Sequence, residues 1–260
     1  MQRFANTRPK PGNRTAAVLL FGGAFFFFIN ACHSPAAHTA AGESRAEQAN
    51  AMQTNAGENE IRPPSEEIRY NGHETPKIVK GGNLAAELLS SAAYQKALSG
   101  GAYGEMAYLF LEHYKKWFRL EDPRRELRLD NVWSDALDTT HVQLQQVVKD
   151  VPVWGKTIRL HFKPEGCIYL FQGDYAPGLT HVNIRPGISA GQAVEAALSA
   201  AADSGDWTVA ENTLYVFVAS SEKAHLVYGV TLLRGIMERR LWMVDAVEGR
   251  IVHTLRLNPS

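Results

Sequence analysis

The sequence predicts an α+β protein built from two units, each with helices packed against an antiparallel sheet. The first observation is that helical segments followed by closely spaced strands occur twice, over residues 84–175 and again over 189–257. The second is that the strands alternate apolar and polar residues, which is the pattern of half-buried strands. Sequential strands with short connections favour antiparallel pairing. Hydrophobic residues make up 45% of the chain, which is enough for a sizeable core.

Residues 1–31 have the pattern of a bacterial signal peptide. The first 14 residues are basic and contain no acid, and an apolar run follows over 15–29. That run has the length of a signal-peptide core and is short for a spanning helix. Ile-Asn-Ala-Cys at 29–32 resembles a lipobox, which implies that Cys32 is lipidated and begins the mature chain. An uncleaved anchor and an ordinary secretory signal are the alternatives.

The lipobox resemblance implies a location in the cell envelope. The expected site is the outer membrane, facing the periplasm, or the outer face of the plasma membrane. Residues 32–79 are expected to be a disordered tether, because they nearly lack large apolar residues and cannot bury enough surface to offset chain entropy. With Cys32 committed to lipid, no intramolecular disulfide is expected. Cys167, in an apolar strand, is expected to be a buried structural thiol.

The first ordered unit is expected to span residues 80–183. Helices are predicted over 84–98 and 105–118, and Gly100 should end the first of them. Four strands are predicted to follow as an antiparallel meander, over 126–135, 141–148, 157–162 and 167–175.

The two middle strands form a predicted hairpin whose connection holds Pro152 and Gly155. Proline fixes its own φ and glycine tolerates positive φ, so both suit a turn. A hairpin alone does not explain why the polar residues Gln145 and Gln146 stand side by side, or why Trp154 sits at the turn.

The second unit is expected to span residues 184–260. Ser189 and Gln192 form a predicted capping box at the start of a helix that Gly205 should end. Strands are predicted over 213–220, 224–233 and 239–257, and the last contains a hairpin turn at Glu248–Gly249.

No catalytic constellation emerges from the polar residues. The chain has no formal net charge, which argues against a nucleic-acid partner. The single His-Glu pair continues into a proline instead of a zinc-peptidase helix. The nine histidines are scattered without metal-ligand spacing. Two arginine pairs, Arg124–Arg125 and Arg239–Arg240, could bind an anion but favour solvated strand flanks. We therefore expect no enzyme, no cofactor and no metal.

The hairpin region nevertheless resembles the propeptide domain of fungalysin- and thermolysin-type metalloproteases. That family shows a His-Val-x-x-Gln-Gln strand, a Val-Pro-Val-aromatic-Gly turn and a following glycine. The matching residues here are His141, Val142, Gln145, Gln146, Val151, Pro152, Val153, Trp154, Gly155 and Gly166. One departure is Asp150, where such propeptides commonly have glycine.

The second unit resembles the PepSY domain that follows this propeptide domain in the precursors. The residues that carry the resemblance are the helix start at 189–197 together with Trp242, Val244, Asp245, Ala246 and Gly249. The expected fold of each unit is a helix on a cystatin-like antiparallel sheet. In the precursors a catalytic domain follows, whereas this sequence ends at Ser260.

The resemblance implies a membrane-tethered, non-catalytic protein that binds a thermolysin-like metalloprotease in trans, as inhibitor or folding assistant. Candidate contact residues are Gln145, Gln146 and Trp154 on the sheet, with plain sheet packing as the alternative. The C-terminal residues Leu255 and Leu257 could enter the protease cleft, or they could simply finish the last strand. Two other interpretations of the chain stay open. It could be an envelope scaffold or ligand-binding module without a protease partner, or the truncated front of a protease precursor.

Overall fold

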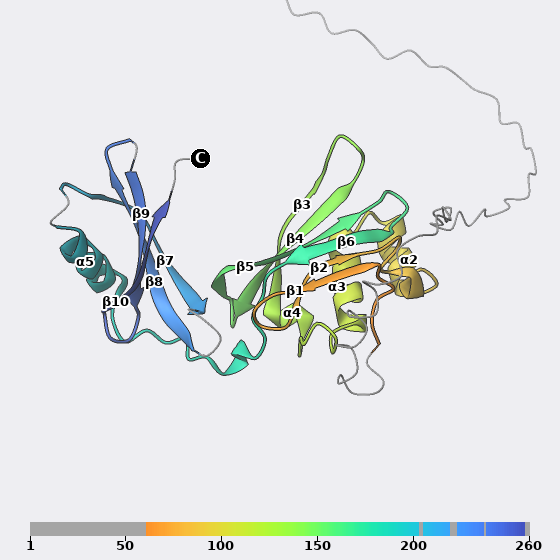
Figure 1. Cartoon of the computed structure of the whole chain (residues 1–260), viewed down its shortest axis with the longest axis horizontal. Helices are drawn as coiled ribbons and strands as arrows, with labels where there is room; N and C mark the ends of the chain where they lie inside the picture. The colour runs from red at the N-terminus through yellow and green to blue at the C-terminus, as the bar shows by residue number, and fades with distance from the viewer. Residues whose placement is uncertain (1–60, 203–204, 219–222, 237, 258–260) are drawn as a thin grey trace, which may run out of the picture. The chain divides into compact units, whose positions relative to one another are not determined.

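The computed structural model of the chain describes residues 61–202, 205–218, 223–236 and 238–257 (Figure 1). The predicted signal peptide, Cys32 and most of the predicted tether lie outside these residues. The described part is α+β, with a few helices and strands that pair almost entirely antiparallel, so the predicted fold class is confirmed.

Six strands form the first sheet, in the order β1-β2-β6-β5-β4-β3. The predicted meander is present as the four consecutive strands β3 to β6. The strands are β1 (Glu67–Tyr70), β2 (Pro76–Lys80), β3 (Leu127–Ser134), β4 (Thr140–Val148), β5 (Val151–Phe162) and β6 (Ile168–Gly173).

Strands β1 and β2 correct the predicted tether, which was drawn as far as residue 79. Both strands belong to the sheet, and β2 pairs with β6 through Ile78, Val79 and Lys80. The short apolar pair Ile78–Val79 gives this segment a place in the core, where Val79 is fully buried. The tether prediction is therefore wrong for residues 67–79.

Short helices cover one side of this sheet. They are η1 (Ala86–Leu88), α2 (Ala92–Ser99), α3 (Tyr103–His113) and α4 (Pro123–Glu126). The predicted helix 84–98 is broken, because η1 ends before Ser91 begins α2 in an extended conformation. The helices and the sheet enclose an aromatic-rich core that includes Tyr94, Phe110 and Phe171.

The second sheet contains β7 (Thr208–Val218), β8 (Ala224–Arg234), β9 (Glu238–Asp245) and β10 (Ile251–Leu257), paired antiparallel in chain order. The helix α5 (Ala190–Ala201) contacts these strands. The capping box is confirmed, since the Ser189 side chain accepts from the Gln192 amide and the Gln192 side chain accepts from the Ser189 amide. The predicted turn at Glu248–Gly249 is also present, with Gly249 at φ 75°.

The hairpin turn between β4 and β5 lies at a different place from the predicted one. Its two residues are Lys149 and Asp150, with φ of 48° and 71°. Pro152 and Gly155 instead lie inside β5. Positive φ at both central residues is the property of the hairpin turn whose twist matches the flanking strands. Lys149 and Asp150 form this turn without a glycine, so the sequence contains only a weak signal for a turn at this position.

Strand β5 contains a bulge. Pro152 and Gly155, the residues predicted to form the turn, lie at its edge and inside it. The register runs from Gln145↔Thr157 directly to Val147↔Pro152, so residues 153–156 loop out of the ladder with β4. Gly155 adopts φ 68° inside this bulge. Val153 pairs there in parallel with Val216 of β7, so β5 contributes to both sheets.

Candidate functional site

The residues of the propeptide-like motif build the bulge of β5. The Gln145 side chain lies against it, and its Nε2 donates to the carbonyls of Gln146, Val153 and Lys156 at 2.9, 2.8 and 3.0 Å. Val153 and Lys156 lie in the bulge, where neither has a register partner in β4. Gln145 therefore donates hydrogen bonds to carbonyl groups of the looped-out backbone, which need such partners where they are shielded from water.

Gln146 points to the opposite side and is buried. Its Nε2 donates to the Ala176 carbonyl at 2.6 Å, and its Oε1 accepts from the Ala176 amide at 3.0 Å. Only 1% of the residue is exposed. The expectation of an exposed glutamine pair that contacts a partner is wrong for Gln146, because both ends of its amide are used inside the fold.

The other predicted contact residues pack within the structure. The Trp154 ring meets the Phe217 ring edge to face, with centroids 6.0 Å apart. Leu255 and Leu257 finish β10, opposite Leu241 and Arg239 of β9, and pack on the small cluster that also holds Trp154. This arrangement agrees with the alternative in which the two leucines complete the last strand. Residues 258–260 lie outside the described part of the chain.

The two remaining motif positions of the second unit form a turn. The Asp245 carboxylate accepts hydrogen bonds from the amides of Val247 and Glu248, both at 2.9 Å, and lies 3.5 Å from His225. Partial burial opposes ionisation, but these hydrogen bonds hold the pKa of Asp245 below its usual range. Gly249 completes the turn, so Asp245 and Gly249 have a structural role here.

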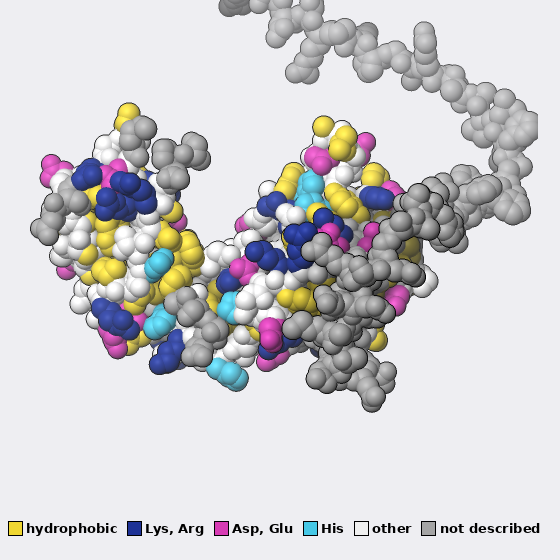
Figure 2. Space-filling view, in the orientation of Figure 1, with side chains coloured by type: hydrophobic (Ala, Val, Ile, Leu, Met, Phe, Trp, Pro, Cys, Tyr) yellow, Lys and Arg dark blue, Asp and Glu magenta, His cyan; other side chains and the backbone are white. Residues whose placement is uncertain are grey.

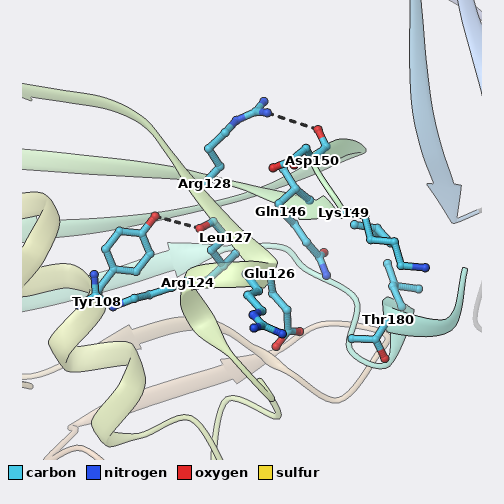
Figure 3. A pocket seen from close by; sticks show the side chains of 13 residues that line it. Tyr108, Arg124, Glu126, Leu127, Arg128, Gln146, Lys149, Asp150 and Thr180 are labelled. Carbon is cyan, nitrogen blue, oxygen red and sulfur yellow. Dashed lines mark hydrogen bonds between the residues drawn. The ribbon is translucent and has the colours of Figure 1, made fainter. Parts of the chain in front are cut away.

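A pocket of about 500 Å³ opens beside the motif (Figure 3). It lies between α3, α4, the first residues of β3, the end of β4, the Lys149–Asp150 turn and the short η2 helix (Leu179–His181). Its volume falls in the range of small-molecule sites. Tyr108 forms one wall, and its hydroxyl donates to the Leu127 carbonyl at 2.9 Å.

The pocket carries cations at its rim and a fixed charge network in its wall. Arg124 is fully engaged, with two hydrogen bonds to Glu105 and one to Glu112. Arg128 reaches the Asp150 carbonyl at 3.4 Å (Figure 3). Arg125 and Lys149 also line the opening. The sequence indicated Arg124–Arg125 as a possible anion site but gave no sign of Arg128 and Lys149, because these residues come together only when the β4–β5 turn is placed at 149–150.

Glu126 is the acidic residue in the pocket lining that is buried. Its Oε1 accepts from the amides of Glu121 and Asp122, both at 2.7 Å. Burial raises the pKa of Glu126 above its usual range, although these two hydrogen bonds work in the opposite direction. The carboxylate thus holds the start of α4 in place and leaves the rim predominantly basic.

Two histidines meet on the outer side of the first sheet. His141 and His161 are register partners, and their Nδ1 atoms lie 2.7 Å apart. His141 Nε2 contacts Asp135 at 3.1 Å, and the His141 ring stacks on Trp133. Burial, and after it the charges of His141 and Arg159, lowers the pKa of His161 to about 4. Motif residue His141 therefore has a buried neutral neighbour.

The histidine pair does not complete a metal site. In the described ranges, no group of three or more histidine, cysteine, aspartate or glutamate residues could hold a metal ion. The same part of the chain contains no helix with the length and apolar character to cross a membrane.

Cys167 departs from its expected state. It is 1% exposed and disulfide-bonded, and its partner lies outside the described residues. The expectation of a free thiol at Cys167 is therefore wrong, whereas its expected burial is present.

Part of the chain matches a known family model. Residues 125–175, from the pocket rim in α4 to the end of the meander, match the Fungalysin/Thermolysin Propeptide Motif. A bacillolysin of Brevibacillus brevis is 26% identical in an alignment of 167 residues that covers 59% of this chain and 31% of that protein. The chain thus spans about a third of the length of this curated relative.

Two solved structures share a more distant likeness. One is the C-terminal domain of YpeB from Bacillus megaterium, with 12% identity, a TM-score of 0.33, and coverage of 61% of this chain and 65% of that one. The other is a predicted lipoprotein of Clostridium difficile 630, with 12% identity, a TM-score of 0.25, and coverage of 60% and 92%.

Proposed function

We propose that this chain is a membrane-tethered, non-catalytic, propeptide-like protein that binds a thermolysin-like zinc metalloprotease in trans, as inhibitor or folding assistant. The observation that carries the proposal is the match of residues 125–175 to the propeptide motif. The motif residues are intact and each has a defined place in the fold. A propeptide acts through a complementary surface and needs no reactive groups of its own.

The surface we assign to the protease is the β3–β4 ribbon. Strand β3 pairs with β4 alone among the described strands, so its outer edge offers unpaired backbone groups. Six of its eight residues are exposed. Val132 on the strand and Leu137 at the ribbon tip are 41% and 83% exposed, which adds apolar contact area. An extended segment of a partner could add to such an edge as a further strand.

The test is inhibition of a purified thermolysin-like protease by the full chain, with casein hydrolysis as the readout. The wild-type chain should inhibit, or should raise the refolding yield of the denatured protease. The double variant Val132→Glu/Leu137→Glu places charge on the ribbon and should weaken inhibition at least about tenfold, which corresponds to about 1.4 kcal/mol.

The matched control is Val209→Glu/Val247→Glu, which changes two similarly exposed apolar residues, one in β7 and one in the turn between β9 and β10. This control should inhibit like the wild type, and both variants should keep the wild-type melting temperature. A wild-type chain that neither inhibits nor assists refolding would refute the proposed function. Equal inhibition by both double variants would refute the β3–β4 contact while leaving the function in place.

The pocket favours a second candidate, a ligand-binding module for a small anion. Its basic rim of Arg125, Arg128 and Lys149 would suit a carboxylate or phosphate. A thermal shift with citrate or inorganic phosphate that disappears in Arg128→Ala/Lys149→Ala, and persists in Lys163→Ala, would support this candidate. No shift in the wild-type chain would exclude these two ligands.

A further inference from the structure

The hairpin between β8 and β9 ends in an exposed apolar side chain. Ile236 is 96% exposed, the most of any large hydrophobic residue in the described part of the chain. Gly235, beside it, adopts φ 59° and so permits the sharp reversal. The ladder below is regular, with Arg234 opposite Glu238 and Leu233 opposite Arg239. Ile236 is thus held at the end of a paired ribbon.

Four arginines surround the base of this ribbon. Arg234 and Arg240 pair with Glu238, Arg256 of β10 lies 3.4 Å from the same carboxylate, and Arg239 lies 3.8 Å from Glu211. Two carboxylates face four guanidinium groups, so the cluster keeps an excess of positive charge. Figure 2 shows Lys and Arg side chains gathered at the part of the second sheet where Figure 1 labels β9.

The arrangement of the arginines is held by an aromatic ring. The guanidinium carbons of Arg234 and Arg240 lie 5.1 and 5.3 Å from the centroid of the Trp207 ring. Trp207 in turn donates from Nε1 to the Ala201 carbonyl at 3.1 Å and packs on Trp242. Two of the four cations are therefore fixed in position, while Arg239 and Arg256 remain the more exposed pair, at 49% and 70% of the side chain.

We propose that the β8–β9 hairpin tip docks on an anionic lipid surface, with Ile236 entering the headgroup region and the surrounding arginines contacting lipid phosphates. An apolar tip flanked by cations fits a membrane interface, where apolar atoms and basic groups are accommodated at different depths. Basic residues near an anionic bilayer are attracted by its negative surface potential. The excess positive charge beside Ile236 favours an anionic lipid surface over an uncharged one. The inference is independent of the proposed protease partner.

The test uses the full chain in vesicles and a probe at the tip itself. Ile236→Trp introduces an indole that brominated phosphatidylcholine quenches only when it enters the bilayer. The tip tryptophan should be quenched in vesicles containing about 30 mol% phosphatidylglycerol, and not in vesicles of phosphatidylcholine alone. Added salt at about 0.5 M should abolish the quenching, because it screens the arginines.

The control probe is Val247→Trp. Val247 is also apolar and exposed, at 57%, but it follows the opposite end of β9. The wild-type chain gives the background from its native tryptophans. Any quenching caused by the N-terminal apolar segment is common to all variants and cancels in the comparison.

The charge requirement is tested in the Ile236→Trp background. Arg239→Gln/Arg256→Gln should lose the quenching that phosphatidylglycerol induces, whereas Arg239→Lys/Arg256→Lys should keep it. Absence of quenching at the tip in either vesicle, or equal quenching at 236 and 247, would overturn the proposal. The first of these outcomes would leave the arginine cluster as a protein-contact surface.

Discussion

The side-chain amide of Gln146 binds both backbone groups of Ala176: it donates to the carbonyl and accepts from the N–H. The contact joins the end of β4 to the chain that leaves β6, thirty positions further along. Because the site is buried, neither backbone group of Ala176 can turn to water instead.

The Gln146–Ala176 pair leads to a stability prediction. Replacing Gln146 with Leu keeps the volume similar but leaves the amide and carbonyl of Ala176 without partners, which should lower the free energy of unfolding by about 2–4 kcal/mol. Urea unfolding of the full chain measures this. Gln172→Leu, at a half-buried position of β6, should change stability by less than about 1 kcal/mol. Equal effects of the two substitutions would contradict the role of Gln146.

A second prediction concerns the turn between β4 and β5. Asp150 has φ 71°, a region that glycine adopts without strain. Asp150→Gly should therefore raise the free energy of unfolding by roughly 0.5–1 kcal/mol, while Asp150→Ala should lower it, because alanine tolerates this region less well than aspartate. Denaturant midpoints of the two variants check the opposite signs. A loss of stability in both would show that the Asp150 side chain matters more than its backbone angle.

His161 predicts how stability depends on pH. Its pKa is about 4 in the folded chain and 6.5 for an ordinary histidine, so the unfolded chain binds more protons between these values. The stabilisation is complete above about pH 6.5 and declines as the pH falls toward 4, by at most about 1.4 kcal/mol per pH unit.

The measurement is urea unfolding at several pH values between 7 and 4.5. His161→Phe should flatten the decline in this window, because phenylalanine does not titrate. His181→Phe changes an exposed histidine and should leave the decline unchanged. An unchanged slope in His161→Phe would mean that other groups cause the loss of stability at low pH.

The cysteines give a fourth prediction. Lipidation occupies the sulfur of a cysteine, so Cys32 cannot carry lipid and form a disulfide in the same molecule. We expect lipidated chains to expose one reactive thiol, Cys167, after denaturation without reductant. Chains without lipid should react only after reduction, in keeping with the disulfide-bonded state of Cys167. Mass spectrometry after maleimide labelling separates the two populations. A lipidated chain with an unreactive Cys167 would contradict this exclusivity, and Cys32→Ala should carry no lipid.

The periodic segments of the chain could be predicted from sequence. The meander, the capping box at Ser189 and the turn at Gly249 all follow from local patterns that the packing reinforces. The strands β1 and β2 could not, because each is short and stands next to a polar region that gives no periodic signal. Their place in the sheet depends on pairing with β6, almost a hundred residues away.

The candidate site shows where local signals mislead. Pro152 and Gly155 are typical turn residues, yet they serve a bulge, while the turn uses Lys149 and Asp150. A turn placed a few residues away from its true position gives the wrong strand register, so the pairing of His141 with His161 could not be predicted. The bulge adds residues to β5 but not to β4. Counting outward from the turn therefore gives the wrong partners for the residues of β5 beyond the bulge. The adjacent residues Gln145 and Gln146 were a sequence signal for this irregularity, because adjacent side chains of a strand point to opposite faces and each polar side chain needs its own hydrogen-bond partners.

The double membership of β5 has a consequence for how the fold comes apart. Val153 lies in the ladder to β7, and Val148 and Val153 pack with the core residues of the second sheet, while Leu160 and Phe162 of the same strand lie in the core of the first. Melting the first sheet removes Val153 of β5 from the edge of the second sheet, and melting the second sheet exposes the apolar side chains of Val148 and Val153. Heat should therefore unfold both hydrophobic cores in one cooperative transition, and a substitution that weakens one core should shift the melting of both by the same number of degrees.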